Sequence, residues 1–481
     1  MAEAGSSFRR DRARHRCLRQ TSAIDSPRGA DYASAMVMNG DRRIGILSTR
    51  LAGTDGVSLE VAKWAEVLGR LGYSCFYLAG ELDRPPEASR LVPEAFYRHP
   101  DIAAINAAAY SGSWDTTAAA DSEHPAIRRR DYFSPYVRPD AVTRRIHELR
   151  SHLKREIYQF IRDFDLDLLL VENALAIPLN LPLGLAIAEV VAETGIPVIA
   201  HHHDFSWERQ RFAVNSVADY LAAAFPPALP SVRHVVINTV QAHQLATRTG
   251  LSAQVIPNVM DFDRPPAPPD AYALGARAAL GVAEGDYFIL QPTRVIQRKG
   301  IEHAIELTRR LGVPATLVIS HAGGDEGTDY TQRIQEFAHL LDVHVRFEAD
   351  LVDAARGMTA DGRRIYTLDD VYPRSDLVTY PSSIEGFGNA FLEAVYHRRP
   401  IVVNRYSIYE VDIRPHGFRV VEFDNYVSRA TIDETRRLLE HPEIGAEWAE
   451  TNYALALRHF SFTVLERRLA AVLAECFGER R

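Results

Sequence analysis

The stretch YPSSIEGFGNAFLEAVYHRRPIVV, residues 380–403, decides how this chain folds. Its flanks VTYPS and PIVVN are short and apolar, which predicts two buried strands, and NAFLEAVYHR between them has the pattern of a helix. The glycine-rich residues 386–388 then form a strand-to-helix turn, where backbone N–H groups commonly bind an anion. Two carboxylates accompany this turn, Glu385 directly before it and Glu393 eight positions after Glu385. The pattern therefore predicts a ligand site here.

The composition indicates an ordinary globular protein with more than one domain. The chain has 481 residues, 46% of them hydrophobic and 25% charged, which is too long for a single core. Its formal net charge of −8 argues against nucleic acid as the main partner, because a phosphate polymer needs a basic face. The cysteines at positions 17, 75 and 476 are far apart, which fits a reducing compartment, so we expect a cytoplasmic protein.

Neither the interior nor the N-terminus of the sequence predicts a membrane segment. No apolar run approaches the roughly 20 residues that cross a bilayer, and no basic amphipathic helix is evident, so we expect no stable membrane association. Residues 1–41 are rich in arginine and lack an apolar core, which argues against a secretory signal. We expect a disordered tail there, or sequence upstream of an alternative start at Met36 or Met38.

Strands and helices alternate along the chain in two series. RIGILST (43–49) predicts a first strand, followed by a glycine-containing loop and the helix LEVAKWAEVLGRLG, an order that indicates a parallel sheet with helices on both faces. The alternation restarts with the strand YFILQPTR and the basic loop VIQRKG. Between the series, DRPPAPPD (263–270) is stiff and poor in backbone donors, which places the boundary. We therefore predict Rossmann-like domains at 42–264 and 265–458.

The polar residues of the second series gather at the carboxyl ends of the predicted strands, where open α/β sheets bind ligands. Arg294 and Lys299 lie in one loop and can hold two phosphates, the first as a fork and the second as a point charge. Glu393 cannot bind phosphate but can accept two hydrogen bonds from a ribose diol, and Glu385 can accept from sugar hydroxyls. Together these residues predict a site for a diphosphate with a sugar at each end, a nucleotide-sugar.

These motifs resemble a known family. PTRVIQRKG together with SSIEGFGNAFLEA is similar to the retaining glycosyltransferases of the GT-B fold, in particular family 4, whose signature Glu-x7-Glu matches Glu385 and Glu393. The loop Gly53–Gly56 and IPNVMDF around Asn258 fall at the expected order and spacing. The resemblance covers nearly everything from Arg43 onward. It implies two Rossmann-like doubly wound domains facing across a cleft, with a last helix in 459–481 that returns to the N-terminal domain.

The resemblance also implies roles in the donor site. Arg294 and Lys299 would stabilise the diphosphate and the charge that develops as it leaves. Glu393 would hold the ribose and Glu385 the transferred hexose, while His203 would contact the donor sugar. The donor-binding residues so implied are Arg294, Lys299, Glu385, Gly386, Phe387, Gly388, Asn389 and Glu393, and the catalytic ones are His203, Arg294, Lys299 and Glu385. The family retains the anomeric configuration without a carboxylate nucleophile, unlike retaining glycoside hydrolases.

The N-terminal domain would hold the acceptor. The residues expected to bind it are Gly53, Gly56, Glu172, Asn173, Asp204, Arg209 and Arg405. Arg209, Arg211 and Arg405 would suit an anionic acceptor such as a phosphorylated or carboxylated glycoside. Plainer interpretations stay open, because Gly53–Gly56 also fits a simple tight turn and Glu172–Asn173 an ordinary strand end.

The histidines His201, His202 and His203 raise the alternative of a metal site. Consecutive residues leaving a strand point to opposite sides, so at most two of the three could share an ion, and no second cluster supplies clear further ligands. We expect no metal and no required cofactor, with Mg²⁺ at most stimulating. A metal-dependent hydrolase built on this run is the remote alternative. A nucleotide-sugar-binding regulator without activity is a third, against which the intact donor residues argue.

One region departs from the family pattern. Many members follow the Glu-x7-Glu helix with a strand and a small Gly-Gly loop, but here NRYSIYEVDI places Arg405, Tyr406 and Tyr409 at that point. Such bulky residues would reshape the sugar pocket or reach an acceptor. HHHDFSWER and NRYSIYEVDI together resemble the branch containing mannosylglucosyl-3-phosphoglycerate synthases, which use GDP-mannose.

We therefore expect a retaining hexosyltransferase that moves a hexose from a nucleoside diphosphate sugar, GDP-mannose by this resemblance, to a small anionic or sugar acceptor. The product would be an α-glycoside. The alternative within the fold is a sucrose-phosphate or trehalose synthase type that uses UDP- or ADP-glucose. The expected partners are the small-molecule donor and acceptor, and a homo-oligomer is compatible with the sequence.

Overall fold

The computed structural model describes residues 42–53, 55–110, 135–323 and 329–478. The predicted N-terminal tail, residues 1–41, lies outside this described part. Residues 41–481 form one compact unit. Among the described helices, none is long and apolar enough to cross a membrane.

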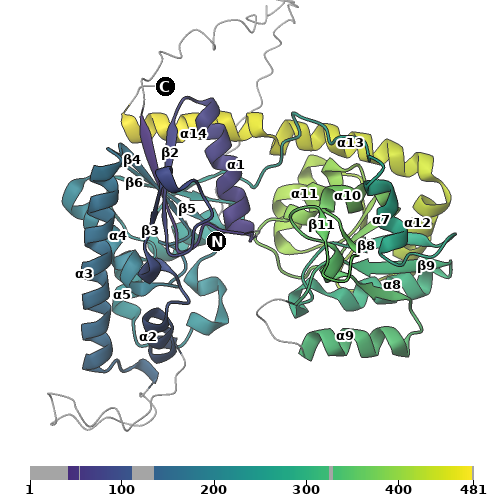
Figure 1. The fold of residues 1–481 in the computed structure, drawn as a ribbon, viewed down its shortest axis with the longest axis horizontal. Coiled ribbons are helices and arrows are strands. Elements are labelled where there is room, and N and C mark those ends of the chain that lie inside the picture. The colour runs from purple at the N-terminus through teal and green to yellow at the C-terminus, as the bar shows by residue number, and fades with distance from the viewer. Residues whose placement is uncertain (1–41, 54, 111–134, 324–328, 479–481) are drawn as a thin grey trace, which may run out of the picture. The chain divides into compact units, whose positions relative to one another are not determined.

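The first half of the chain forms a sheet of seven strands that are all parallel (Figure 1), in the order β3-β2-β1-β4-β5-β6-β7. The strands are β1 (Arg43–Leu47), β2 (Ser74–Ala79), β3 (Ser89–Leu91), β4 (Leu168–Glu172), β5 (Val198–His202), β6 (Val232–Val236) and β7 (Ala253–Val255). The chain order reverses between β1 and β4, and at such a switch point the strand ends leave a crevice for a ligand. β1 and β4 are buried throughout apart from Arg43, as expected for strands covered on both faces.

Helices cover both faces of this first sheet. The longer ones are α1 (Gly56–Arg70), α2 (Pro100–Tyr110), α3 (Asp140–Asp163), α4 (Leu181–Thr194) and α6 (Thr239–Thr249), and α5 (Ala218–Ala224) is short. Leu153 of α3 and Val190 of α4 pack with Leu169 in one apolar cluster, while Trp64 of α1 packs with Ile44 in another. Alternate strand residues therefore face different helices, because successive side chains of a strand point to opposite faces.

The second half repeats the plan with six parallel strands in the order β10-β9-β8-β13-β14-β15. They are β8 (Tyr287–Gln291), β9 (Ala315–Ile319), β10 (Val345–Phe347), β13 (Leu377–Tyr380), β14 (Ile401–Asn404) and β15 (Val421–Phe423). The helices are α7 (Ala276–Ala279), α8 (Ile301–Leu311), α9 (Asp329–Leu340), α10 (Leu368–Val371), α11 (Asn389–Tyr396), α12 (Arg429–Glu440) and α13 (Pro442–Phe460). Its switch point lies between β8 and β13, next to the stretch 380–403.

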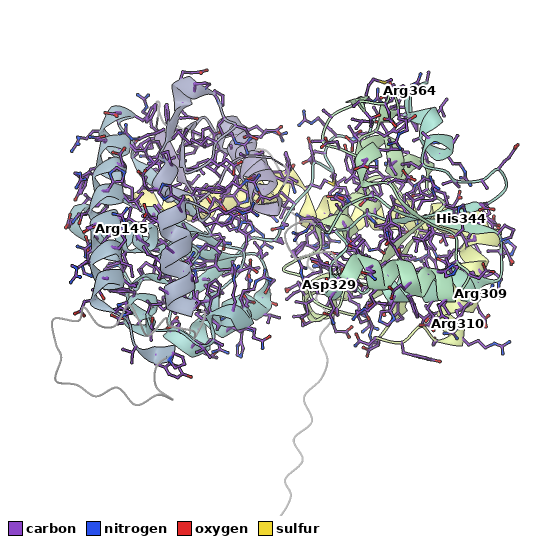
Figure 2. All side chains as sticks on the ribbon, turned by 60° about the horizontal axis from the view of Figure 1, so that its bottom comes forward. Arg145, Arg309, Arg310, Asp329, His344 and Arg364 are labelled. Atoms are coloured by element: carbon purple, nitrogen blue, oxygen red, sulfur yellow. The ribbon has the colours of Figure 1, made fainter. Side chains whose placement is uncertain are left out.

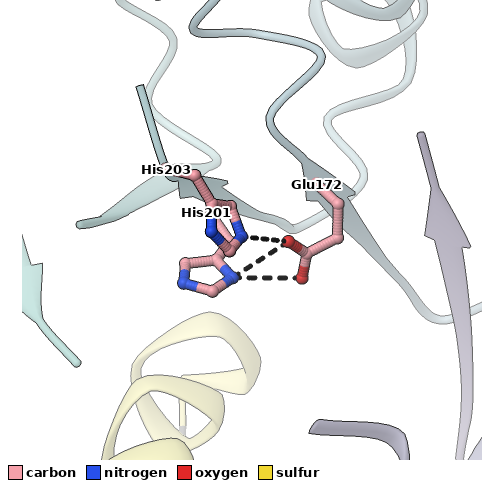
Figure 3. Close-up of side chains that lie close together, drawn as sticks. All are labelled: Glu172, His201 and His203. Atoms are coloured by element: carbon pink, nitrogen blue, oxygen red, sulfur yellow. Dashed lines mark hydrogen bonds and ion pairs between the residues drawn. The ribbon is translucent and has the colours of Figure 1, made fainter. Parts of the chain in front are cut away.

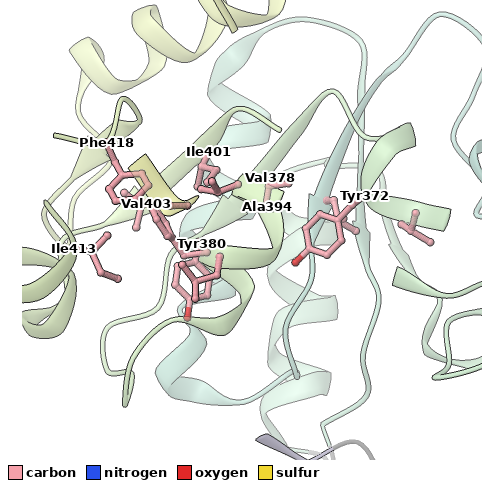
Figure 4. Close-up of a cluster of buried hydrophobic side chains, with 14 of the residues drawn as sticks. Tyr372, Val378, Tyr380, Ala394, Ile401, Val403, Ile413 and Phe418 are labelled. Atoms are coloured by element: carbon pink, nitrogen blue, oxygen red, sulfur yellow. The ribbon is translucent and has the colours of Figure 1, made fainter. Parts of the chain in front are cut away.

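The strands and helix predicted from 380–403 are present as β13, α11 and β14. Val378 and Tyr380 of β13, Ala394 of α11 and Val403 of β14 belong to one buried cluster (Figure 4). A short hairpin, β11 (Gly357–Met358) with β12 (Arg364–Ile365), precedes them and was not predicted. Its strands are too short to leave an alternating pattern in the sequence.

The last helix, α14 (Phe462–Phe477), packs against the first sheet. Its Leu465 and Leu469 share a core with Ile44 and Trp64. The domain boundaries themselves stay a prediction. Charged side chains stand on the outside of both halves, among them Arg145 on α3 and Arg309 on α8 (Figure 2).

Candidate active site

The glycine-rich turn before α11 is shaped by a buried tyrosine. Gly388 has a φ of +142°, a conformation that favours glycine, and a β-carbon there would lie 2.4 Å from the hydroxyl oxygen of Tyr406. That hydroxyl donates a hydrogen bond to the carbonyl oxygen of Phe387 at 2.9 Å. Tyr406 is only 2% exposed, so it supports the turn from behind and is not placed to reach a substrate.

The same turn contacts the N-terminal half. The side-chain amide of Asn238, which also caps α6, donates to the carbonyl oxygen of Gly386 at 2.8 Å. A β-carbon on Gly386 would lie 3.4 Å from Ile237 and 3.7 Å from the carbonyl oxygen of His203. The turn is thus held against the carboxyl ends of β5 and β6, where it joins the two halves.

Glu385, expected to hold the donor hexose, is engaged by two cations. Lys299 forms an ion pair with it, and Arg298 lies 3.2 Å away. Burial opposes the charge of Glu385, but the positive charges of Lys299 and Arg298 outweigh it and hold the pKa of the carboxyl below its ordinary value. Two residues predicted to bind different parts of the donor therefore bind each other here.

Arg294 is exposed and makes no ion pair within the described part of the chain. Its charge acts on Lys299 and on His321, which follows β9. Burial, together with Arg294 and Lys299, lowers the pKa of His321, so this imidazole is neutral at pH 7. The corner is therefore cationic, as a diphosphate requires.

Glu393 lies on α11 and is half-buried. It accepts a hydrogen bond from the hydroxyl of Tyr372 at 2.8 Å, and burial raises its pKa above the ordinary value. Lys63 of α1 is its charged neighbour from the other half, and Asn258 donates to the side-chain oxygen of Asn389 at 2.8 Å beside it. The predicted ribose site is thus another place where the halves meet.

Three buried side chains meet at the ends of β4 and β5 (Figure 3). His201 Nδ1 lies 3.0 and 3.1 Å from the two carboxylate oxygens of Glu172, and His203 Nε2 lies 3.1 Å from one of them. Burial opposes the charge of Glu172, but both histidines outweigh it and lower its pKa to about 2. An ionised carboxylate only accepts, so both ring nitrogens donate.

The pKa values of the two histidines are shifted in opposite directions. Burial disfavours a charged His203, but the hydrogen bond and charge of Glu172 outweigh it and raise the pKa of that imidazole. Burial lowers the pKa of His201 more than Glu172 raises it. The group therefore favours the charged form of His203 and the neutral form of His201 around one carboxylate. His203 is 8% exposed and its Nε2 is committed to Glu172, so Nδ1 is the ring atom left for a substrate.

The ligand atoms of Glu172, His201 and His203 lie within 4.8 Å of one another, so they could hold a metal ion. This corrects our expectation that no further ligand would join the histidines: the β4–β5 register pairs Glu172 with His201, whereas His202 points away and bonds to His234. The surroundings fit a hydrogen-bonded group better. His201 Nε2 is buried without a partner among the described residues, its ring stacked on Trp64, and a metal on Nδ1 would leave a buried Nε2–H without an acceptor.

A cavity of about 620 Å³ opens at the strand ends of both halves. Its lining includes the predicted residues Asn173, Asp204, Arg209 and Arg294. Arg211, which the sequence suggested for an anionic acceptor, lines it as well. So do residues that were not predicted for the site, among them Ser48, Thr49, Arg50, Asp55, Tyr97 and Arg298. Ser48 to Arg50 follow β1 at the switch point, a position that could have identified them, whereas nothing in the sequence marks Tyr97.

Other predicted residues do not line this cavity. The Gly53 amide donates to Asp83 at 2.7 Å, and Asp55 caps α1 by accepting from the amides of Val57 and Ser58. These amides are therefore already used, which leaves fewer donors for a phosphate or an acceptor than expected. Gly56, Glu172 and His203 are also absent from the lining, as are Lys299, Glu385 to Asn389 and Glu393 of the second half.

Arg405, expected to bind the acceptor, likewise lies outside the cavity. It has two carboxylate partners, Glu410 at 3.5 Å and Asp424 at 3.3 Å.

Comparison with known proteins gives the family. No protein-family model matches the sequence. The mannosylglucosylglycerate synthase of Petrotoga mobilis is 30% identical over 402 residues, which cover 79% of this chain and 86% of that protein. The chain belongs to the mannosylglucosylglycerate synthase family. The protein of the same name from Thermotoga maritima is 28% identical over 88% of this chain and 98% of its own length.

The predicted branch is also represented among the relatives. The mannosylglucosyl-3-phosphoglycerate synthase of Petrotoga mobilis is 24% identical, but over only 47% of this chain and 44% of that protein. The two relatives from Petrotoga mobilis and Thermotoga maritima that match over most of their length are therefore both named for a product without a phosphate group.

Solved structures show the same fold. A glycosyltransferase from Rickettsia africae superposes with a TM-score of 0.63 at 12% identity, covering 92% of this chain and all of that one. The sucrose-phosphate synthase of Thermosynechococcus elongatus has a TM-score of 0.59 at 12% identity, covering 91% of this chain and all of that one. The GT-B fold, with two Rossmann-like domains across a cleft, is confirmed, and the chain is a glycosyltransferase.

Proposed function

We propose that this glycosyltransferase transfers a mannosyl group from GDP-mannose to glucosylglycerate with retention of configuration, forming an α-glycoside. The observation that carries the proposal is the family membership, because the relatives' name describes a product built from mannose, glucose and glycerate. The cavity supports it physically. It combines a cationic corner at Arg294 and Arg298 with a polar wall at Asn173, Asp204 and Arg209.

On binding, the donor diphosphate would replace Glu385 as the partner of Lys299 and Arg298. In the structure Lys299 and Arg298 are paired with this carboxylate. A diphosphate carries more charge than a carboxylate and can accept from Arg294, Lys299 and the turn amides together. Glu385, once released, can accept from hydroxyls of the hexose. Glu393 would accept from the ribose, with Tyr372 fixing its orientation.

The transfer step needs no covalent enzyme intermediate. The bond between the sugar C1 and the phosphate oxygen breaks while the acceptor hydroxyl oxygen bonds to C1 from the same face. The acceptor proton moves to the leaving phosphate oxygen. Arg294 and Lys299 stabilise the charge on that phosphate, the term that commonly contributes most to catalysis. Positioning and exclusion of water supply the rest, and His203 Nδ1 would contact the hexose.

The proposal also concerns the need for a metal and the alternative function within the fold. We infer that neither a metal nor another cofactor is required, because the surroundings of the one candidate ligand group within the described residues fit hydrogen bonding better. The sucrose-phosphate synthase alternative rests on structural likeness at 12% identity, which concerns the fold alone.

The testing experiment offers the purified protein four acceptors, namely glucosylglycerate, glucosyl-3-phosphoglycerate, glucose and fructose 6-phosphate. Each is paired with GDP-mannose, UDP-glucose and ADP-glucose, with and without EDTA. Mass spectrometry detects the product and NMR its anomeric configuration. We expect an α-mannosyl product from GDP-mannose and glucosylglycerate, with EDTA present or absent. Transfer only to fructose 6-phosphate, or an inverted product, would contradict the proposal.

A further inference from the structure

Five arginines line the cavity, and they differ in whether their charge is already matched. Arg50 lies 3.2 Å from Glu81, Arg209 lies 2.7 Å from Asp204, and Arg298 lies 3.2 Å from Glu385. The other two, Arg211 and Arg294, form no ion pair within the described residues. One of these lies in each half of the molecule.

The unmatched arginine of the second half already has a proposed ligand, since Arg294 follows β8 in the loop that would bind the donor diphosphate. Arg211 lies in the first half, in the short helical turn Gln210–Phe212 after β5. It is therefore on the wall that faces the acceptor rather than in the donor loop. The sequence suggested an anionic acceptor for it, but did not say which acceptor group its guanidinium would bind.

Aromatic neighbours hold the side chain of Arg211 in place. Phe212, the next residue, is 5% exposed and packs edge-on against Tyr110 of α2 with ring centroids 4.8 Å apart. The guanidinium of Arg211 lies over the Phe212 ring at 4.6 Å. The charged and titratable groups that act on it are Arg209, Asp204, Tyr110 and Tyr97. The one carboxylate among them, Asp204, is bonded to Arg209.

We propose that Arg211 binds the carboxylate of the acceptor and so selects a glycerate-bearing glycoside over a neutral one. This inference rests on the proposed function and deepens it. A planar guanidinium holds a carboxylate through two parallel hydrogen bonds, and the aromatic ring beneath it limits the orientations of the fork. Arg209 is not the selecting residue, because Asp204 already takes its charge.

The test measures kcat/KM with GDP-mannose for a matched pair of acceptors, glucosylglycerate and its uncharged analogue glucosylglycerol. They differ in the carboxylate alone. The quantity compared is the ratio of the two kcat/KM values in wild type, Arg211→Gln and Arg211→Lys. Losing the two charge-assisted hydrogen bonds of the guanidinium lowers this ratio by roughly 10- to 100-fold in Arg211→Gln. Arg211→Lys retains the positive charge but not the paired hydrogen bonds, and it recovers part of the ratio.

The matched control is Arg145→Gln, which removes a guanidinium of the same half that is paired with Asp101 outside the cavity. We expect it to leave the ratio within about 3-fold of wild type. An unchanged ratio in Arg211→Gln, or a ratio that falls equally in Arg145→Gln, would overturn the inference. So would a loss that appears only as a raised KM for GDP-mannose with both acceptors, because Arg211 would then serve the donor.

Failure of the proposed function gives a different result. If wild type transfers to neither acceptor from any sugar nucleotide, the acceptor proposal fails and the role of Arg211 fails with it. If wild type uses glucosylglycerate and Arg211→Gln keeps the full ratio, only the role of Arg211 fails.

Discussion

The two halves compensate their buried charges in different ways. In the second half, Glu385 is neutralised by Lys299, a pair next to the cavity that a ligand can replace. In the first half, Glu172 is hydrogen-bonded to His201 of the neighbouring strand and to His203 just after it, and its charge favours a protonated His203, in a group that is almost entirely buried. A replaceable pair suits a binding site, whereas a closed group fixes the strand ends. We therefore expect damage to the Glu172 group to appear mainly in stability and damage to the Glu385 pair mainly in binding and turnover.

The largest expected effect is on stability and concerns Glu172. Glu172→Gln removes the carboxylate between two buried imidazoles, and breaking a buried pair in this way costs about 3–5 kcal/mol. Denaturant unfolding at pH 7 measures it. Asp204→Asn, which breaks the partly exposed pair with Arg209, is the control and should cost at most about 1 kcal/mol. A Glu172→Gln protein as stable as wild type would show that the group is not the fixed element described.

The next effect is on turnover and concerns Arg294. Arg294→Ala should lower kcat about 100- to 1,000-fold, as for other groups that stabilise developing charge. Its unfolding free energy should stay within about 0.5 kcal/mol of wild type, because it makes no ion pair in the described part of the chain. Arg309→Ala, an exposed arginine on α8, should change neither quantity. An Arg294→Ala protein that lost stability but kept its turnover would contradict the contrast drawn between the two halves.

The third effect is a pH dependence of stability from the buried histidines of the first half. Burial, then the charge of His234, lowers the pKa of His202, and burial lowers that of His234 to about 4. Unfolding lets both take up protons below about pH 6.5, so this stability is complete above pH 6.5 and is lost as the pH falls toward 4. The His234 contribution is about 3 kcal/mol.

Unfolding free energies between pH 7.5 and 4 test this, and His234→Gln should flatten the curve. The exposed His441→Gln serves as a control. His203 acts in the opposite sense: its pKa is raised, so its stabilisation is present below pH 6.5 and is lost as the pH rises through its folded pKa. A stability that falls from pH 6.5 to 7.5 would mean that His203 dominates in that range, whereas no loss of stability between pH 6.5 and 4 would contradict the assignment to His202 and His234.

The smallest effect separates binding from chemistry at Glu385. Glu385→Gln frees Lys299 and Arg298, so GDP should bind about 3- to 10-fold more tightly while mannosyl transfer falls. Calorimetry with GDP measures the first and the transfer assay the second. Glu302→Gln, which breaks the pair with Arg333 in the same half, is the control. Weaker GDP binding would show that Glu385 helps to position Lys299 and Arg298 for the diphosphate, instead of competing with the diphosphate for them.

The sequence predicted what is encoded locally. The glycine-rich turn, its helix and the two glutamates lie within 380–403, and the basic loop lies in the few residues after β8, so local spacing predicted both as parts of a ligand site. The alternation of strands and helices predicted two parallel α/β domains, and the resemblance to family 4 implied the GT-B fold. Arg298 stood in the quoted loop, but its pairing with Glu385 across about ninety residues left no local pattern.

What the sequence could not give depends on strand order and packing. Glu172 reaches His201 because β4 and β5 are neighbours in register, which the residues of either strand do not reveal. The bulky residues after β14 were expected near a substrate. Tyr406 instead supports the glycine turn, and Arg405 is paired with Glu410 nearby in the chain and with Asp424 after β15.

The most direct test of the account is protection against thermal unfolding by GDP, UDP and ADP, each with and without EDTA, in wild type and Lys299→Ala. A ligand that binds only the folded state adds about 2.7 kcal/mol at a hundredfold excess over its dissociation constant. We predict protection of wild type by GDP that EDTA does not remove, and much weaker protection of Lys299→Ala. No protection by any of the three nucleotides, with stabilisation by zinc in their place, would contradict the account and move the functional site to Glu172, His201 and His203.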